Sequence, residues 1–348
     1  MDMQADNNFQ AADVQLDNHH RPLVTIALMT YRQEKYAAEA VRSVLSQTYE
    51  PLRIVISDDA SPDGTWDVIL REVESYKEKG GCHKDIVLNR NEQNVGIVPH
   101  WSRIVSFARG ELLVAAAGDD VSDCNRVKRI VEEWERKDRR PTVIHHGAYQ
   151  IDIEGNVVGE WPPRSVKWPQ GAVAAYAMKV FKFFEPLPIS VLVEDVPWSW
   201  RAFMLGPELQ IDELLCRCRV GSGVSTSFKS LRGYRVAMAQ FEASAFAQLE
   251  KDVGFAREQM DERKYREVVA EIAERSEKSQ WELKLLSGTL MERFAAIRWH
   301  IQKGKMSFGS KLFYVRDWMY ILPPFINAPL VEFADLFARS VHNMRWRA

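Results

Sequence analysis

The sequence lacks several features that would assign it to a large functional class. Its four cysteines in 348 residues are too few for a disulfide framework, which predicts a reducing, cytoplasmic setting. A formal net charge of −2 gives no support for nucleic-acid binding. Neither Gly-x-Gly-x-x-Gly after the first expected strand nor Gly-x-x-x-x-Gly-Lys-Ser/Thr is present, which disfavours a dinucleotide-binding fold and a P-loop nucleotidase.

Long apolar runs are also missing. Residues 1–21 are polar, have no core of signal-peptide length and predict a disordered lead-in. The most apolar stretch, residues 318–331, is too short to span a membrane and contains Pro323-Pro324. Three interpretations of it stay open: an interfacial membrane segment, a helix docked on its own domain, and a contact with a partner subunit.

Strand and helix patterns alternate from Leu23 to about Tyr149, and the pattern predicts four strands and three helices. The expected strands are residues 23–29, 52–57, 86–88 and 111–117, and the expected helices are residues 34–47, 66–77 and 98–108. Such repeats predict an α/β fold with a mostly parallel sheet and helices on both faces. A hairpin with its turn at 154–156 is expected next, and helices over 237–249, 252–275 and 280–300 follow.

Polar and acidic side chains follow three of the expected strands. These strands end at Thr30-Tyr31-Arg32, at Ser57-Asp58-Asp59 and at Gly118-Asp119-Asp120. Parallel strands place such ends at one edge of the sheet, where ligands bind. Two adjacent carboxylates repel each other unless a cation or hydrogen-bond donors lie between them, so a divalent metal carrying a diphosphate suits this edge. A turn followed by a helix cap at Asp123 or Asn125 is the alternative.

A nucleotide would fit among these loops. Asp58 would accept a hydrogen bond from N3–H of uracil or thymine, and Tyr31 would lie against the base. One of Asp119 and Asp120 would meet the ribose and the other the metal.

Another acidic pair, Glu194-Asp195, follows a short apolar run and precedes a helix expected to end at Leu205. Asp195 would lie at the helix N-terminus with its side chain free to deprotonate a sugar hydroxyl, and an ordinary helix cap is the alternative. Trp198 and Trp200 would either stack on an acceptor sugar or pack in the core.

Two other pairs have structural interpretations. Strand alternation would turn one of His145 and His146 inward and the other outward, which favours a structural role over a metal ligand. Cys216 and Cys218 have the wrong spacing for a zinc knuckle, and alternation on a strand explains them.

Taken together, and in this order along the chain, these segments resemble the family 2 glycosyltransferases of the GT-A fold. The resemblance covers about Leu23 to Ser225, including the nucleotide loop at residues 56–65, Asn94-Val95-Gly96 and Glu194-Asp195. It implies inverting transfer of a sugar from a nucleotide-sugar, UDP- or dTDP-linked by preference, to a hydroxyl of a glycan or lipid-linked glycan. It also implies a Mg²⁺ or Mn²⁺ ion and a setting such as bacterial surface-polysaccharide or O-antigen assembly.

Carried over residue by residue, the resemblance implies a role for each site residue. Asp195 would be the catalytic base, Asp120 and Asp119 the metal ligands, and Glu194, Trp198 and Trp200 the acceptor side. The nucleotide-sugar would be bound by Thr30, Tyr31, Arg32, Asp58, Asp59, Asn94, Gly96, Asp119 and Arg219.

The sequence departs from the family at three positions. Cys218 and Gly221 replace a Tyr and a His, which leaves the phosphate role of Arg219 open, with Lys229, Arg232 or Arg235 as alternatives. Ala117 stands where many relatives have a further Asp, so metal binding would rest on the Asp119-Asp120 pair.

The family resemblance predicts three regions along the chain. Residues 1–21 form the lead-in, residues 22–235 the GT-A domain with halves at 22–120 and 121–235, and residues 236–348 a helical region that would contact a membrane or form a homo-oligomer.

Two other functions stay open. One is a nucleotidyltransferase acting on sugar phosphates, although its usual glycine-rich loop is missing after the first strand. The other is a non-catalytic glycan-binding or scaffold protein.

Overall fold

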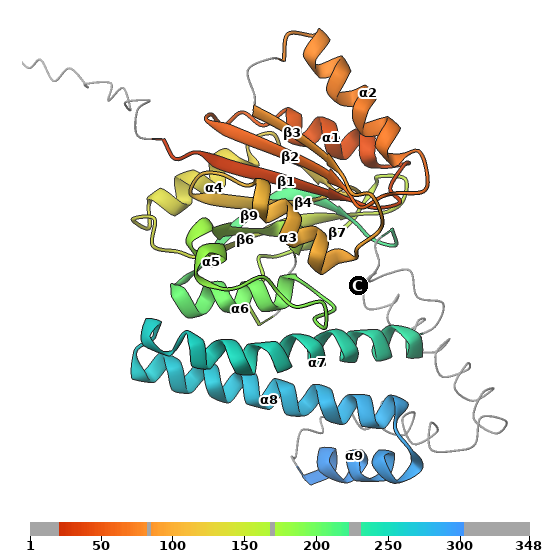
Figure 1. The fold of residues 1–348 in the computed structure, drawn as a ribbon, viewed down its shortest axis with the longest axis vertical. Helices are drawn as coiled ribbons and strands as arrows, with labels where there is room; N and C mark the ends of the chain where they lie inside the picture. The colour runs from red at the N-terminus through yellow and green to blue at the C-terminus, as the bar shows by residue number, and fades with distance from the viewer. Residues whose placement is uncertain (1–20, 82–84, 168–170, 223–230, 303–348) are drawn as a thin grey trace, which may run out of the picture.

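A mixed sheet forms the centre of the protein, as shown in Figure 1 for a computed structural model that describes residues 21–81, 85–167, 171–222 and 231–302. The strand order is β3-β2-β1-β4-β8-β6-β9-β5, and β7 pairs with β6. The strands are β1 (Val24–Thr30), β2 (Leu52–Asp58), β3 (Asp85–Arg90), β4 (Leu112–Ala117), β5 (Val121–Ser122), β6 (Val143–Ile151), β7 (Val157–Trp161), β8 (Ala174–Ala177) and β9 (Glu208–Arg219).

The N-terminal half of the sheet is parallel. Strands β1, β2, β3 and β4 all run in one direction, and each overlaps one of the four expected strand segments. Strand β8 is antiparallel to both β4 and β6, and β6 runs parallel to β9. The β6–β7 hairpin also occurs where the sequence predicts it. The α/β prediction is therefore confirmed.

Helices cover both faces of the sheet. The core on one face contains apolar side chains of α1 (Ala37–Leu45), α2 (Thr65–Glu78) and α4 (Arg126–Glu135). The core on the other face contains those of α3 (Ile97–Phe107), α5 (Met178–Phe183) and α6 (Asp195–Leu205). Ile26 and Leu28 face the first layer and Ala27 the second, which explains why the strand is apolar without a break.

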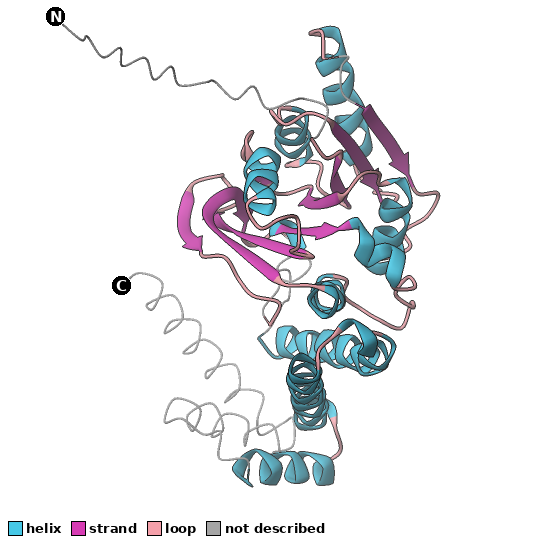
Figure 2. Ribbon diagram, turned by 90° about the vertical axis from the view of Figure 1, so that its left-hand side faces the viewer, coloured by secondary structure: helices cyan, strands magenta, loops and turns pink. Residues whose placement is uncertain are grey.

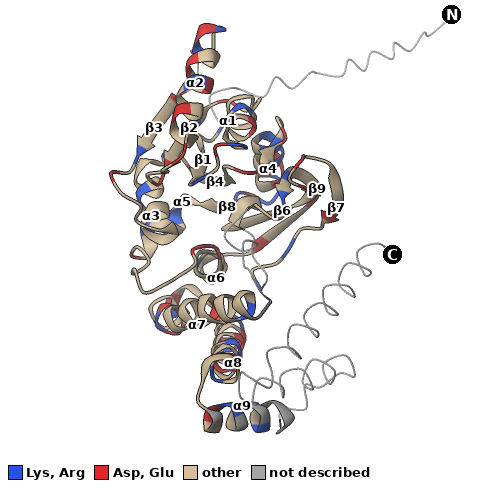
Figure 3. Cartoon of the chain, turned by 90° about the vertical axis from the view of Figure 1, so that its right-hand side faces the viewer, with Lys and Arg blue, Asp and Glu red and all other residues tan. Residues whose placement is uncertain are grey.

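Three further helices continue the second layer away from the sheet: α7 (Leu231–Phe255), α8 (Glu262–Ser287) and α9 (Leu290–Gln302). Figure 1 and Figure 2 show α7 below α6, α8 below α7, and α9 at the far end. Phe246 of α7 and Ile272 of α8 share the core that contains Trp200 of α6. Acidic and basic residues alternate in patches along α7 and α8 (Figure 3).

The boundaries of these helices correct the sequence interpretation. The prediction of one helix over 252–275 is wrong, because α7 ends at Phe255 and α8 begins at Glu262. Asp261 is the reason: its side chain caps α8 by accepting a hydrogen bond from the Lys264 backbone N–H at 2.8 Å. The prediction of one helix over 280–300 is also wrong, since α8 ends at Ser287 and α9 begins at Leu290. The expected domain boundary after residue 235 falls inside α7.

Within the described ranges, no helix has the length and apolar character needed to cross a membrane. Residues 1–20 of the lead-in expected at 1–21, and the apolar stretch at 318–331, lie outside the described residues.

A buried ion pair joins α6 to α7. The Arg201 guanidinium donates from Nε to Asp252 Oδ2 at 2.7 Å and from Nη2 to Oδ1 at 3.0 Å. Its Nη1 donates to the Glu185 carbonyl, and the two paired side chains are 2% and 8% exposed. The C-terminal helices are thus held to the sheet domain by both apolar packing and a bidentate charge contact.

We expect Asp252→Ala to lower the free energy of unfolding by about 3–5 kcal/mol, because it leaves the Arg201 charge buried without its partner. Urea denaturation would measure the loss. The double variant Arg201→Met, Asp252→Leu is the matched control, and it should recover much of the stability by removing both charges. A loss below about 1 kcal/mol for Asp252→Ala would show that the pair adds little.

Candidate functional site

The parallel register brings the three polar strand ends together. Thr30 at the end of β1 pairs with Asp58 at the end of β2. On the other side of β1, Met29 pairs with Ala117, and its carbonyl accepts from the Gly118 N–H at 2.9 Å. The loops after β1, β2 and β4 therefore begin side by side at one edge of the sheet, as the sequence predicts.

Asp58 closes the loop that follows β2. Its Oδ1 accepts from the hydroxyls of Thr30 at 3.0 Å and Ser61 at 2.5 Å, and its Oδ2 accepts from the Ser61 N–H at 2.9 Å. The Arg90 Nε lies 3.8 Å from Oδ2. The carboxylate is fully buried and satisfied by protein donors. Its contact with a base stays a prediction.

Asp59 fixes the neighbouring loop rather than facing solvent. It accepts from the Asn91 side chain at 2.7 Å and from the backbone N–H groups of Val95 and Gly96 at 3.0 Å each. Gly96 has a φ of +84°, a conformation that favours glycine, and α3 starts directly after it. Asp59 thus sets the position of the exposed Asn94.

Hydrogen bonds from backbone N–H groups to side-chain hydroxyls join the loops after β1 and β2, and we call this pair the clasped loops. The Arg32 N–H donates to Ser61 Oγ at 2.9 Å, and the Gln33 N–H donates to Thr65 Oγ1 at 2.9 Å. Arg32 and Ala60 have φ values of +55° and +56°, which are uncommon for residues with a side chain. Tyr31 is half-buried and Arg32 exposed, so both side chains remain accessible to a ligand.

Asp119 connects the third loop to the first. Its Oδ1 accepts from the Gln33 side chain at 2.9 Å, and its Oδ2 accepts from the Ser222 hydroxyl at 2.7 Å. Burial raises the pKa of this carboxyl, and the Ser222 hydrogen bond partly opposes the rise. A network from Asp58 through residues 30–33 to Asp119 therefore joins the donor-side acids.

Asp120 points the other way, into the sheet. Its Oδ1 accepts from the Arg219 N–H at 2.8 Å, and its carboxyl lies within 4.8 Å of the thiols of Cys216 and Cys218. Burial raises the pKa of Asp120 well above its usual value. Cys216 and Cys218 are two residues apart in β9 and are both buried, with exposed Arg217 between them, which is the strand alternation that the sequence predicts. A cation between them would meet the charge of Arg126, which is buried close to the same group.

The chemistry of the Asp119-Asp120 pair fits a hard divalent cation. Carboxylate oxygens are the ligands that Mg²⁺ and Mn²⁺ prefer. Burial raises the pKa of both carboxyls, and a bound cation would relieve the cost of holding them ionised. Of the two, Asp119 has its carboxyl on the side of the clasped loops.

Arg219 ties several loops together. Its guanidinium donates to the backbone carbonyls of Asp119, Asp152 and Ile153 at 2.9–3.2 Å and to Glu39 Oε2 at 3.1 Å. Its side chain is 2% exposed. Its predicted contact with the donor stays untested. Of the alternatives, Lys229 and the side chain of Arg232 lie outside the described residues, and Arg235 pairs with Glu282 in α8.

The acceptor-side pair lies at the start of α6. Glu194 occupies the cap position without a side-chain cap bond, and Asp195 is the first helical residue. Asp195 accepts from the N–H groups of Val196 at 2.7 Å and Gly171 at 3.3 Å, so its side chain is less free than predicted. Burial raises the pKa of Asp195 and, with Asp195 beside it, raises the pKa of Glu194 to about 8.

Trp198 and Trp200 do not face a cavity. They are 3% and 1% exposed, and both belong to the core between the sheet and α7. Trp198 packs on Phe181, and Trp200 packs edge-on against Phe246. The structure therefore corrects the predicted sugar platform in favour of core packing.

His145 and His146 alternate between the two faces of β6, but the expectation that one of them points outward is wrong, because both faces of the strand are covered and both rings are buried. His146 Nδ1 donates to the Gly147 carbonyl at 2.7 Å, and its Nε2 accepts from Arg126 Nε at 2.8 Å. Burial and this guanidinium lower the pKa of His146 well below its usual value. The structural role that the sequence favours is confirmed for His146.

Arg126 is a residue that the sequence interpretation missed. Its Nη2 donates to the carbonyls of Ala115 in β4 and Ala172, at 2.7 and 2.8 Å. Ala172 follows Gly171, which bonds Asp195, so one guanidinium links the strand of Asp119 to the segment holding Asp195. Its sequence signal is a charge on the apolar stripe of α4, four residues before Ile130.

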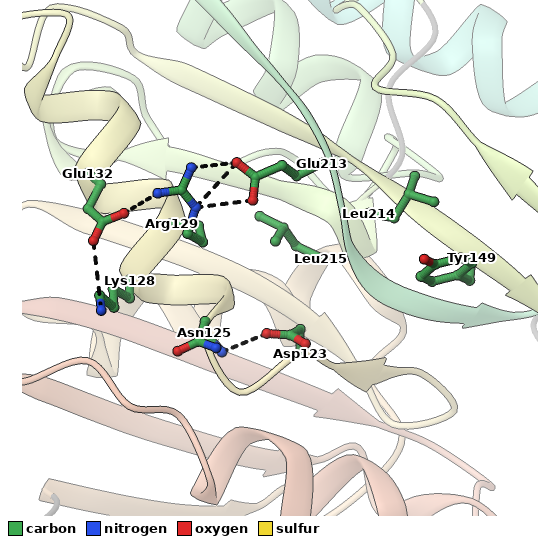
Figure 4. Close-up of a pocket in the computed structure, with 9 residues that line it drawn as sticks. All are labelled: Asp123, Asn125, Lys128, Arg129, Glu132, Tyr149, Glu213, Leu214 and Leu215. Carbon is green, nitrogen blue, oxygen red and sulfur yellow. Dashed lines mark hydrogen bonds and ion pairs between the residues drawn. The ribbon is translucent and has the colours of Figure 1, made fainter.

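An open pocket of about 630 Å³ lies elsewhere, between α4 and β9 (Figure 4). Arg129 projects into it and is paired with Glu132 and Glu213, and Tyr149 lies at its far side. None of the predicted site residues lines this pocket. With its arginine already neutralised, the pocket offers little to a diphosphate.

Comparison with known proteins supports the same family. Residues 25–169 match the family described as "Glycosyl transferase family 2". The chain is 27% identical over 151 residues to an uncharacterized glycosyltransferase of Methanocaldococcus jannaschii, covering 43% of this chain and 50% of that protein. It is 26% identical over 222 residues to a chondroitin synthase of Escherichia coli, covering 60% and 30%. The matched part thus spans half or less of these relatives.

Solved structures show the same fold. The mannosyltransferase PcManGT from Pyrobaculum calidifontis, in complex with GDP-Man and Mn²⁺, aligns with a TM-score of 0.58 at 17% identity, covering 95% of this chain and 90% of that one. S. aureus TarS 1-349 aligns with a TM-score of 0.52 at 14% identity, covering 88% and 82%. The predicted GT-A fold with C-terminal helices is confirmed.

Proposed function

We propose that this chain, which belongs to glycosyl transferase family 2 through its residues 25–169, transfers a sugar from a nucleotide-diphosphate sugar to a hydroxyl of a glycan or lipid-linked glycan. The observation that carries the proposal is the clasped set of loops at the carboxyl edge of the sheet. There, Asp58 and Asp119 are held by one network through residues 30–33, and Arg126 ties that edge to the segment of Asp195.

The donor would lie on this edge. Tyr31 and Arg32 are the accessible side chains of the first loop, and Asn94 is exposed on the loop that Asp59 holds. We favour a uridine or thymidine nucleotide on the family resemblance, in which Asp58 accepts from N3–H; the base would have to replace the Thr30 and Ser61 donors that now satisfy this carboxylate. Solved structures of this fold contain GDP-Man in PcManGT and UDP-GlcNAc in TarS, so nucleotide-sugars with a purine base and with a pyrimidine base both occur among them.

Asp119, with Asp120 beside it, would hold Mg²⁺ or Mn²⁺. When bound, such an ion stabilises the negative charge that develops on the departing nucleoside diphosphate. The chain's own contribution is to fix the ligand: Gln33 and Ser222 orient the two oxygens of Asp119. Arg219 holds the backbone of the same loop through the carbonyl of Asp119.

Asp195 would act as the base of a direct displacement. The acceptor hydroxyl gives its proton to the Asp195 carboxylate while its oxygen attacks the anomeric carbon, and the bond to the diphosphate breaks with inversion. The N–H groups of Val196 and Gly171 orient the carboxylate. Burial raises its pKa, which makes it a better proton acceptor than an exposed aspartate. Glu194 would contribute to the acceptor side.

Polysaccharide biosynthesis is the setting we propose, and the chondroitin synthase and the putative glycosyltransferase EpsE of Bacillus subtilis are relatives whose names agree with a glycan-building role. Contact of the C-terminal helices with a membrane or a second copy belongs to the same proposal.

A donor screen tests the function. We expect one class of nucleotide-sugar, with Mn²⁺ present, to stabilise the full chain by about 2.7 kcal/mol when its concentration is one hundred times Kd. Thermal unfolding would measure this, and product analysis should then show nucleoside diphosphate. Pyrophosphate release would favour a nucleotidyltransferase. Stabilisation without turnover on any acceptor would favour a glycan-binding scaffold.

A further inference from the structure

We propose that Asp120, Cys216 and Cys218 form a metal site for a thiophilic divalent cation such as Zn²⁺, distinct from the proposed donor cation site. The family resemblance assigns no metal to the two thiols and implies only a Mg²⁺ or Mn²⁺ ion at the Asp119-Asp120 pair. The new site lies on the sheet side of that loop, whereas the Asp119 carboxyl lies on the side of the clasped loops. Its occupancy does not depend on the proposed sugar transfer.

The two thiols already have the separation that a tetrahedral ion needs. Cys216 and Cys218 occupy alternate positions of β9 and therefore face the same side of the strand. Their sulfur atoms are 3.8 Å apart. Two Zn–S bonds of about 2.3 Å at a tetrahedral angle separate their sulfurs by about 3.8 Å. The spacing excludes a zinc knuckle, but a strand brings both thiols to one ion.

Asp120 supplies a third ligand from the loop after β4. One of its carboxyl oxygens and the two sulfurs all lie within 4.8 Å of one another. A tetrahedral Zn²⁺ needs about 3.5 Å between oxygen and sulfur, so a small rotation of the side chain completes the set. The Arg219 N–H donates to Asp120 Oδ1 at 2.8 Å and orients the carboxyl. Two sulfurs and one oxygen suit Zn²⁺ better than Mg²⁺, and water would take the fourth position.

Arg126 is a buried cation that lies beside this site. Its Nη1 donates to the Ser122 hydroxyl at 3.0 Å, and Ser122 pairs with Cys216 across β5 and β9. Its other acceptors are the ring of His146 and two backbone carbonyls, so all of them are uncharged. Ala172, which provides one of these carbonyls, packs against the cluster that contains both cysteines. A fully buried guanidinium normally requires an anionic partner, and a metal complex at the thiols would supply one.

The charges of the complex and of Arg126 balance. When Zn²⁺ binds, the two thiols release their protons to solvent, and Asp120 binds as a carboxylate. Two thiolates and one carboxylate around a doubly charged cation leave one negative charge. The guanidinium of Arg126 neutralises that charge, so its presence favours the thiolate complex. The ion would join the loop after β4 to β9 and thereby brace the loop that contains Asp119.

Cobalt spectroscopy of the full chain tests this site. The chain has four cysteines, so the double variant Cys82→Ser, Cys124→Ser retains only the two proposed ligands. We expect this variant, produced with Co²⁺ under reducing conditions, to contain about one Co²⁺ per chain and to show the thiolate-to-cobalt charge-transfer absorption of a tetrahedral site. Zn²⁺ should remove the absorption by displacing Co²⁺, whereas Mn²⁺, which prefers oxygen ligands, should leave it in place.

Single substitutions in that double variant assign the ligands. Cys216→Ser, Cys218→Ser and Asp120→Asn should each weaken Co²⁺ binding by about tenfold or more, because even the partners of metal ligands contribute that much. Asparagine at position 120 can still accept from the Arg219 N–H. Asp119→Asn is the matched control and should leave the absorption unchanged, because its carboxyl bonds Gln33 and Ser222 on the other side of the loop.

The double variant decides the inference without any substitution in the site. If it shows no charge-transfer absorption with Co²⁺, the site is overturned, even where Cys216→Ser or Cys218→Ser fails to fold. An absorption that is unchanged in Asp120→Asn would overturn the three-residue site as well. None of these measurements requires a nucleotide-sugar. Failure of sugar transfer would therefore remove the proposed function and leave the metal site standing.

Discussion

Asp195→Asn is expected to lower the turnover of sugar transfer by about 10²–10⁴-fold while leaving the dissociation constant of the donor within about twofold. Asparagine keeps one oxygen, which can accept from the Val196 N–H at the start of α6, and loses only the longer contact of the second oxygen with the Gly171 N–H at 3.3 Å. What it loses is the capacity to take a proton from the acceptor hydroxyl. Steady-state transfer assays measure the first quantity, and calorimetry of donor binding measures the second.

The pH dependence has a definite sign. Transfer requires ionised Asp195, and burial raises its pKa, so the rate should rise with pH through that raised pKa and then level off. Asp195→Asn should abolish this rise in whatever activity remains.

Glu194→Gln is the control matched in position and size. With its pKa at about 8, Glu194 is largely protonated at neutral pH and glutamine imitates that form. We expect a smaller effect, seen mainly in the KM for the acceptor. Equal losses for the two variants, or a donor affinity that falls in step with turnover for Asp195→Asn, would argue that Asp195 shapes the site instead of performing the proton transfer.

The strand ends were the most predictable part of the site. An apolar run followed by polar residues predicts where a buried strand stops, and parallel topology then dictates that such ends meet at one edge. Both inferences need only local sequence and one rule of connectivity. The grouping of the loops after β1, β2 and β4 therefore follows from the sequence, although their internal hydrogen bonds do not.

Direction and burial of side chains were less predictable. Alternation alone turned one histidine of β6 outward, yet helices on both faces bury His145 and His146 alike. The sequence around the tryptophans of α6 is compatible with a sugar platform, and it carries no sign that α7 packs against Trp200. In each case a distant segment supplies the surroundings, and a local pattern carries no information about it.

Partners across long sequence separations were not predictable. Arg126, Arg219 and Gln33 bond groups on loops far away in sequence, and no local pattern identifies those partners. The break between α7 and α8 is different, because Asp261 is a local cap signal. The charged pattern continues on both sides of Asp261 and therefore obscures this cap signal.

Asp119→Asn is expected to reduce turnover by about 100-fold or more and to remove the effect of Mn²⁺ on donor affinity. Asp119 is the acid whose oxygens lie on the side of the clasped loops, bonded to Gln33 and Ser222. An amide has the same shape but lacks the charge that a hard cation needs. Free Mn²⁺ can be titrated by electron paramagnetic resonance, and donor binding can be followed by calorimetry with and without the ion.

Asp120→Asn distinguishes ligation from loop shape. Its Oδ1 accepts from the Arg219 N–H, which asparagine preserves, while its carboxyl faces Cys216 and Cys218 away from the donor edge. If Asp119 is the principal ligand, Asp120→Asn should weaken Mn²⁺ binding less than Asp119→Asn does. If the order is reversed, the metal lies on the thiol side of the loop, and the donor would have to approach from there. Unchanged Mn²⁺ binding in both variants would mean that the two carboxyls only hold the loop and do not bind the metal.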